Sequence, residues 1–173
     1  MSYPSLNFAL GETIDMLRDQ VKSFVAKEIA PRAAQIDIDN LFPADLWRKF
    51  GDMGLLGITV PEEYGGAGLG VTEAAIMMHE VASHGGGMAA ASSVHINLFG
   101  PHPIVVFGTP EQKARWLPRL VQGLDQVAFG VTEPDAGLNT TAIKTFARKV
   151  DGGYLVHGQK VWTSTAQVAG KIM

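Results

Sequence analysis

The hydrophobic pattern of the chain changes its period near residues 124–126. Before this point, apolar residues recur at three- and four-residue steps, which is typical of helices that bury one face. The first such stripe consists of Ile14, Leu17, Val21, Phe24, Val25 and Ile29. After residues 124–126, the pattern changes, and residues 127–132 and 154–157 read as short strands. We therefore predict an α+β chain, in which an all-helical N-terminal domain over residues 1–125 is followed by the first strands of an incomplete antiparallel β domain over residues 126–173.

Proline and glycine mark the ends of the first predicted helices. Pro31 should kink or end a helix that runs over about residues 12–37. Pro43 can open a second helix at its first turn, and Gly54 can end it in a left-handed conformation. The residues expected to point inward from this second helix are Leu46, Trp47, Phe50 and Met53.

Later helices should begin at Thr72, near Met88 and at Thr109. The last of these has the strongest start signal, because Thr109 can cap, Pro110 suits the first helical position and Gln112 can complete a capping box. Its buried side should consist of Trp116, Leu117, Leu120 and Val121.

The β region is short. Residues 144–150 partly alternate, and Asp151-Gly152-Gly153 forms a hairpin turn into residues 154–157. So few strands would leave a long open sheet edge, which isolated domains avoid. We therefore expect the chain to be the front part of a longer protein.

Composition excludes several classes of function. The formal net charge is −3 and no Lys/Arg run is interleaved with aromatics, so nucleic acid is not an expected partner. No apolar run approaches the roughly 18 residues of a membrane span, and the N-terminus lacks a signal-peptide pattern. The chain has no cysteine, which fits a reducing compartment. We expect a soluble protein of the bacterial cytoplasm; the mitochondrial matrix would require a transit peptide that has been removed.

Three local patterns suggest sites, but the residues favour plainer interpretations. The glycine-rich residues 64–70 do not fit a phosphate-binding motif and favour a tight loop with positive φ angles. His79 and His84 nearly form a zinc motif, yet their spacing separates them on a helix, so we expect no metal site. Gly100-Pro101 should break any shared helix between His95 and His102, although His95 is kept as a candidate for lining a pocket.

The last third of the chain holds two polar loops, each at the end of a strand-like run. The first reads Thr132-Glu133-Pro134-Asp135-Ala136-Gly137, and the second reads Gly158-Gln159-Lys160-Val161-Trp162-Thr163-Ser164. Together they resemble the acyl-CoA dehydrogenase signature, TEP-x-AG-SD followed by G-x-K-x-W-I-T-N. The resemblance extends to the loop Pro61-Glu62-Glu63-Tyr64-Gly65-Gly66 and to the helix that begins Gly108-Thr109-Pro110-Glu111-Gln112-Lys113.

This resemblance implies a helical domain, a middle β domain and a C-terminal helical bundle, with FAD held where the three meet. It also implies removal of a proton α to a thioester carbonyl and hydride transfer from the β carbon to flavin N5, giving a trans-2-enoyl-CoA. The family's base is a glutamate of the C-terminal domain, so no catalytic residue is assigned in this chain. The positions that match the family's flavin contacts are Phe129, Val131, Thr132, Trp162, Thr163 and Ser164.

Several positions and partners depend on the resemblance alone. Leu138 stands where the family has a serine that contacts acyl-CoA, and Asn139 replaces the following aspartate. We expect Leu138 and His95 to face substrate. Glu133, in a turn beside the flavin loop, favours acceptance of backbone hydrogen bonds over a role as base. The implied partners are an acyl-CoA, an electron-transferring flavoprotein and further copies in a homotetramer. The alternatives are an oxidase or monooxygenase of the same fold, or a non-catalytic helical fragment.

Overall fold

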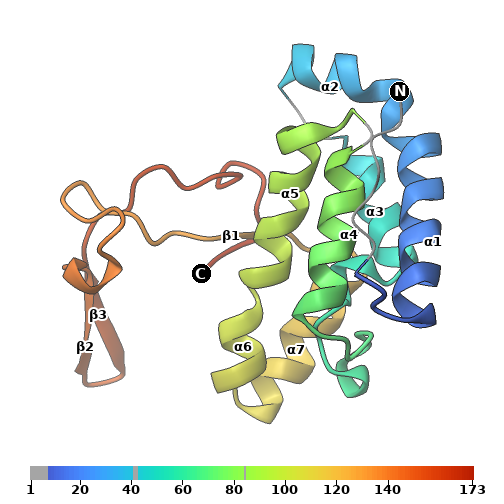
Figure 1. Cartoon of the computed structure of the whole chain (residues 1–173). Helices are drawn as coiled ribbons and strands as arrows, with labels where there is room; N and C mark the ends of the chain where they lie inside the picture. Colours follow the sequence, from blue (N-terminus) through green and yellow to red (C-terminus); the bar gives the residue numbers. More distant parts are fainter. Residues whose placement is uncertain (1–7, 41–42, 84) are drawn as a thin grey trace. The chain divides into compact units, whose positions relative to one another are not determined.

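The computed structural model describes residues 8–40, 43–83 and 85–173, and the chain divides into two compact units, residues 1–124 and 125–173 (Figure 1). The first unit is helical. Its elements are α1 (Glu12–Glu28), η1 (Ala30–Arg32), α2 (Ala33–Asp39), α3 (Ala44–Asp52), η2 (Leu55–Gly57), η3 (Glu62–Tyr64), α4 (Val71–Ser83), α5 (Gly87–Phe99), α6 (His102–Phe107) and α7 (Pro110–Val121). Among the described residues, no helix combines the length and apolarity that a membrane crossing requires.

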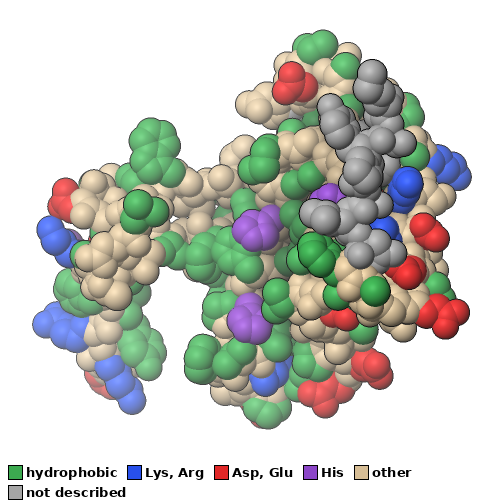
Figure 2. All heavy atoms as spheres, in the orientation of Figure 1, with side chains coloured by type: hydrophobic (Ala, Val, Ile, Leu, Met, Phe, Trp, Pro, Cys, Tyr) green, Lys and Arg blue, Asp and Glu red, His purple; other side chains and the backbone are tan. Residues whose placement is uncertain are grey.

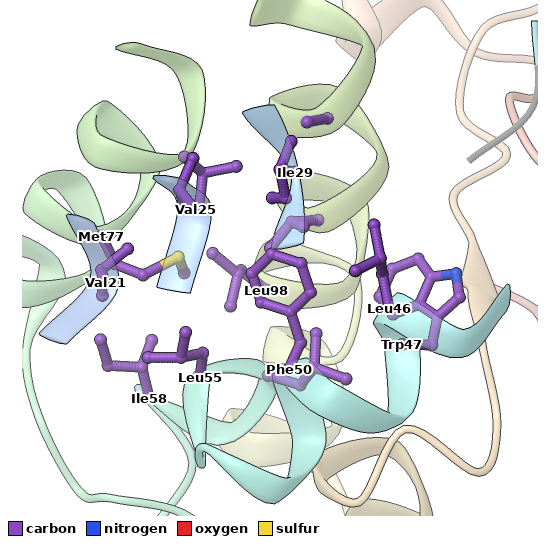
Figure 3. Packing of buried hydrophobic residues seen from close by; sticks show 14 of the residues in the cluster. Val21, Val25, Ile29, Leu46, Trp47, Phe50, Leu55, Ile58, Met77 and Leu98 are labelled. Atoms are coloured by element: carbon purple, nitrogen blue, oxygen red, sulfur yellow. The ribbon is translucent and has the colours of Figure 1, made fainter. Parts of the chain in front are cut away.

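The core of the first unit lies among α1, α3, α4 and α5. α4 packs against both α1 and α5, and the three helices lie side by side in Figure 1. Phe50 is fully buried, and its ring meets that of Phe24 edge-on, with 5.0 Å between the centroids. Burial of each such side chain stabilises the fold by about 1.5–3 kcal/mol. The labelled core residues of Figure 3 are Val21, Val25, Ile29, Leu46, Trp47, Phe50, Leu55, Ile58, Met77 and Leu98.

The predicted break at Pro31 is confirmed. α1 ends at Glu28, Pro31 lies in the 3-10 turn η1, and α2 begins at Ala33. Proline lacks the N–H that a continuing helix requires, so the chain turns here.

The second predicted helix is also observed, with one error at its end. Pro43 caps α3 in an extended conformation, and Gly54 follows with φ 73°. Leu46, Trp47 and Phe50 are buried, as expected, but Met53 is 37% exposed. The prediction for Met53 was wrong because α3 ends at Asp52, so residue 53 no longer follows the helical register of the buried face.

The glycine-rich residues 64–70 form a tight loop, as predicted. Gly65 has φ 86° and Gly68 has φ 62°, a region that side chains with a Cβ rarely adopt. A Cβ on Gly66 would lie 2.0 Å from the carbonyl oxygen of Val60, so only glycine fits there.

Local sequence signals also determine where α5 ends and where α6 and α7 begin. α5 ends at Phe99 and α6 begins at His102, so Gly100-Pro101 does separate His95 from His102. The capping box of α7 is formed: Thr109 Oγ1 accepts from the Gln112 N–H at 3.3 Å, and the Thr109 N–H donates to Gln112 Oε1 at 2.9 Å.

The second unit contains two small strand pairs and a short 3-10 turn, η4 (Thr140–Ala142). β2 (Phe146–Val150) and β3 (Gly153–His157) form the expected antiparallel hairpin, with Gly152 at φ 78° in the turn. β1 (Val127–Ala128) pairs in parallel with β4 (Lys171–Ile172), an arrangement that the sequence did not predict. The strand expected over residues 127–132 therefore stops after Ala128. Figure 2 shows hydrophobic and basic side chains together on the exposed β2–β3 hairpin.

Candidate functional site

The two motif loops of the second unit lie against each other. We name residues 129–137 the first loop and residues 158–165 the second loop. The N–H of Val161 donates to the carbonyl oxygen of Thr132 at 2.9 Å. A Cβ on Gly130 would lie 3.5 Å from Thr163 Oγ1, which shows how closely the loops approach. The structure thus brings together, in one place, the two segments that the sequence singled out.

The carboxylate of Glu133 is the centre of this arrangement. Glu133 is buried, and it accepts hydrogen bonds from the N–H groups of Lys144 at 2.6 Å and Thr145 at 2.9 Å. It also accepts from Lys160 Nζ at 3.0 Å. These donors belong to the segment before β2 and to the second loop. One side chain of the first loop therefore holds two other segments, which confirms the expectation that Glu133 accepts backbone hydrogen bonds.

These donors hold Glu133 in its charged form. Hydrogen bonds to the carboxylate, of which that from the Lys144 N–H is the largest cause, together lower the pKa of Glu133 to about 2, although burial opposes the shift. The Lys160 ammonium group acts in the same direction. A base with so low a pKa takes up protons poorly near neutral pH, so Glu133 is suited to holding backbone and unsuited to removing a substrate proton.

Lys160 is a residue of the second loop to which the motif assigned no role. Its ammonium group donates to the carbonyl oxygen of Val131 at 2.9 Å as well as to Glu133. The side chain is 26% exposed. The sequence signal was its place between Gly158 and Trp162 in a polar loop, and its partner lies on a distant segment.

Trp162 has an unusual backbone. Its φ is 59° and its side chain is 89% exposed. A bulky residue with positive φ is an outlier that costs about 1–3 kcal/mol, and such strain gathers at functional sites. Thr165, at the end of the same loop, has φ 61°. Trp162 lies in no strand, so it is not an aromatic side chain packed within a sheet.

The remaining predicted site residues are placed as follows. Phe129, Val131, Thr132 and Thr163 are partly buried, whereas Ser164 is exposed. Within the described part of the chain, the N–H groups of Val131 and Thr132 donate to no other backbone group. The two loops thus offer successive backbone donors, hydroxyl groups and an exposed indole ring. These are the groups with which a protein contacts a flat heterocycle with polar edges.

Leu138 and His95 are not part of this cluster of contacts. Leu138 follows the first loop and its side chain is fully exposed. His95 lies on α5 in the first unit, where its exposed ring meets that of Phe99 with 4.5 Å between the centroids. A role of either residue toward substrate stays a prediction.

Gly158 begins the second loop at a point of close packing. A Cβ there would lie 2.1 Å from Thr145 Oγ1 and 2.6 Å from Thr145 Cβ. Only glycine lets the second loop pass so near to the segment that Glu133 holds.

The described histidine of the near-zinc motif, His79, is not part of a group of metal ligands among the described residues. His79 Nδ1 lies 3.3 Å from Glu80 Oε1, and His84 lies outside the described residues. In the ranges that the structure describes, no three His, Asp or Glu side chains are grouped to hold a metal ion.

The chain therefore has a helical domain followed by polar loops on short strands. Comparison with known families shows to which family this arrangement belongs. Residues 11–124 match the family model described as acyl-CoA dehydrogenase, N-terminal domain. This chain belongs to the acyl-CoA dehydrogenase family.

Curated relatives support this membership. A mitochondrial isovaleryl-CoA dehydrogenase of Oryza sativa subsp. japonica is 39% identical over 160 residues, which cover 91% of this chain and 39% of the relative. An acyl-CoA dehydrogenase of Bacillus subtilis is 38% identical over 154 residues, covering 89% of this chain and 40% of the relative. The chain thus spans about two fifths of the length of these relatives.

Solved structures show the same fold. Acyl-CoA dehydrogenase complexed with FAD from Bacillus anthracis matches with a TM-score of 0.84 at 31% identity, over 95% of this chain and 28% of the other. The FAD complex of PigA matches with a TM-score of 0.87 at 25% identity, over 95% of this chain and 43% of the other.

Proposed function

We propose that the full-length protein is an FAD-dependent acyl-CoA dehydrogenase that converts an acyl-CoA thioester to a trans-2-enoyl-CoA. Residues 1–125 would form its N-terminal helical domain, and residues 126–173 would begin its flavin-binding middle β domain. One observation carries the proposal: the two motif loops are joined by the Val161–Thr132 and Lys160–Glu133 hydrogen bonds, and they present donors and an aromatic ring together. Family membership supports the same reading.

The residues of the two loops fit a flavin ring. The N–H groups of Val131 and Thr132, with the Thr132 hydroxyl, can donate to the polar edge of the ring. Trp162 offers a flat apolar surface, and Thr163 and Ser164 add hydroxyl groups. When bound, FAD supplies the hydride acceptor for the reaction. The task of the protein is to orient the ring and to stabilise the negative charge that develops on reduction.

None of the residues named in these loops is assigned as the catalytic base. Glu133 is excluded by its engaged oxygens and its low pKa. We propose that the base belongs to a part of the protein after Met173. The 173-residue chain alone should then turn over no substrate.

The partners form part of the proposal. Leu138 and His95 would face the acyl-CoA, an electron-transferring flavoprotein would accept the electrons, and the full-length protein would assemble as a homotetramer. A solved structure described as "Electron transferring flavoprotein of Acidaminococcus fermentans" matches 95% of this chain with a TM-score of 0.84.

A second candidate is a flavin oxidase or monooxygenase of the same fold. Leu138 favours it, because an apolar side chain replaces the serine that the family uses to contact acyl-CoA. The solved structure of PigA with FAD and proline shows that this fold also occurs in a protein with a ligand other than an acyl-CoA. The third reading, a non-catalytic helical fragment, predicts that no flavin binds at all.

Flavin bleaching separates these candidates. The full-length protein should purify yellow with FAD, and a branched, short or long acyl-CoA should bleach the flavin under anaerobic conditions. Bleaching by dithionite alone, with no response to any acyl-CoA, would contradict the dehydrogenase proposal. Rapid reoxidation of the reduced flavin by dioxygen would favour the oxidase or monooxygenase. Protein that stays colourless after addition of FAD would support the non-catalytic reading.

A further inference from the structure

The ion pair between Glu133 and Lys160 joins the two loops, but the proposed function gives it no effect on the backbone of the second loop. Its two side chains are only 6% and 26% exposed. The nearby pair between Asp135 and Lys144 is 75% exposed on both sides, although its atoms are almost as close, at 3.1 Å. Exposed pairs contribute little, whereas an enclosed and fully hydrogen-bonded pair fixes geometry. Within the same unit, the Glu133–Lys160 pair should therefore fix the positions of the segments it joins, whereas the Asp135–Lys144 pair should contribute little.

The enclosed pair connects three segments at one point. Glu133 belongs to the first loop, and its carboxylate holds the N–H groups of Lys144 and Thr145 just before β2. Lys160 belongs to the second loop and also holds the carbonyl oxygen of Val131. Loss of either charged group would leave the other without its partner, so the three segments should loosen together.

The backbone outlier at Trp162 comes directly after this connection. Lys160 is fixed by its side chain, and Val161 is fixed by its N–H bond to the carbonyl oxygen of Thr132. Beyond the outlier, the Thr165 hydroxyl donates to the carbonyl oxygen of Ser164 at 2.6 Å. A strained conformation persists only where its surroundings over-determine it. The two fixed residues before Trp162 provide that restraint.

We infer that Glu133 and Lys160 are a positioning pair, which holds the backbone of Trp162 in its left-handed conformation and so sets how the second loop meets a flavin ring. The part that concerns the flavin rests on the proposed function. Neither residue touches the reacting atoms. Glu133 and Lys160 act through Val161 and Trp162, and they tie the flavin-facing segments to the β2–β3 hairpin.

The first test needs no flavin. Amide hydrogen exchange of the 173-residue chain is measured for Glu133→Gln and for its matched control Asp135→Asn, which makes the same chemical change two residues away in the exposed pair. In Glu133→Gln, the amides of Thr145 and Val161 should exchange at least about tenfold faster, because the segments open locally. Asp135→Asn should leave both rates within about twofold of the wild type. Equal rates in Glu133→Gln and the wild type would overturn the inference.

Lys160→Met and Lys160→Arg distinguish local loosening of the loops from unfolding of the whole chain. Methionine keeps the apolar stem and removes the donors, so Lys160→Met should accelerate Val161 exchange while the amides of α4 and α5 stay protected. Arginine restores charge and donors, so Lys160→Arg should recover a large part of the protection. Failure of arginine to improve on methionine would show that bulk, and not the ion pair, holds the loop.

The second test reads the flavin directly in the full-length protein. Glu133→Gln should change the visible circular dichroism of bound FAD and weaken FAD binding, whereas Asp135→Asn should change neither. An unchanged flavin spectrum in Glu133→Gln would refute the pair's effect on the flavin. If wild-type protein binds no FAD, the proposed function fails, and the amide-exchange result still decides whether the pair positions Trp162.

Discussion

Substitution of Gly158 by alanine tests the close approach between the second loop and the segment before β2. The added Cβ would lie 2.1 Å from Thr145 Oγ1, 2.6 Å from Thr145 Cβ and 2.8 Å from Thr145 Cα, whereas ordinary contacts begin near 3.4 Å. The two segments must therefore separate by roughly 1 Å, a case of overpacking that typically costs about 1–3 kcal/mol. A separation of this size would also disturb the bonds that Glu133 makes with both segments.

Amide hydrogen exchange measures this cost locally. Because each 1.4 kcal/mol changes an opening equilibrium tenfold, the Thr145 and Val161 amides should exchange about 5- to 150-fold faster in Gly158→Ala. The matched control is Gly153→Ala in β3, where the new Cβ meets nothing within 4 Å. That variant should leave both amides unchanged.

A second substitution checks the cause. Thr145→Ala removes the Oγ1 that makes the shortest contact, so the double variant Gly158→Ala/Thr145→Ala should lose less protection than the sum of the single changes. Residues in contact show coupling energies of about 0.5–3 kcal/mol. Additive effects, or an unchanged exchange rate in Gly158→Ala, would refute the argument that steric contact at Thr145 requires glycine.

Three further predictions concern the site. Thr132→Val and Ser164→Ala should each weaken FAD binding in the full-length protein by about 0.5–1.5 kcal/mol, the range of one neutral hydrogen bond, while His79→Ala has no effect; equal losses in all three would indicate general destabilisation. The pKa of Glu133 is lowered, so its contribution to stability is complete above pH about 4.5 and is lost as the pH falls toward about 2; a ¹³C titration of its carboxyl group with a midpoint near 4.5 would contradict this. If acyl-CoA is the substrate, Leu138→Ser should preserve or improve acyl-CoA affinity, measured by flavin bleaching; impaired turnover would indicate that leucine serves a different substrate.

The sequence predicted those parts of the fold that local chemistry determines. Pro31 ends α1 because it lacks a donor, and Thr109 starts α7 because its hydroxyl and Gln112 satisfy free N–H groups. Gly152 supplies the positive φ that the hairpin turn requires. Each of these effects acts within a few residues, so a single sequence is enough to predict it.

Contacts between distant segments could not be predicted in the same way. β1 and β4 contain two residues each and lie at opposite ends of the second unit's sequence, so neither shows a strand period. The prediction that Met53 is buried failed because it depended on the exact end of α3, and the helix ends one residue earlier, at Asp52. The motif identified Lys160 as part of a loop, but its partner Glu133 lies 27 residues away and could be named only from the structure.

The two kinds of information meet at Trp162. Its place in the second motif suggested a contact with flavin, whereas its left-handed backbone and its exposed ring are visible only in the structure. A tryptophan that merely stabilised the unit would be expected to bury its ring, because burial is how an aromatic side chain contributes most. This ring contributes little burial and its backbone is strained, so its conformation has a cost that burial of the ring does not recover. The enclosed pair between Glu133 and Lys160 offsets that cost from the adjoining residues, and a ligand that packs on the indole would give the exposed ring its function.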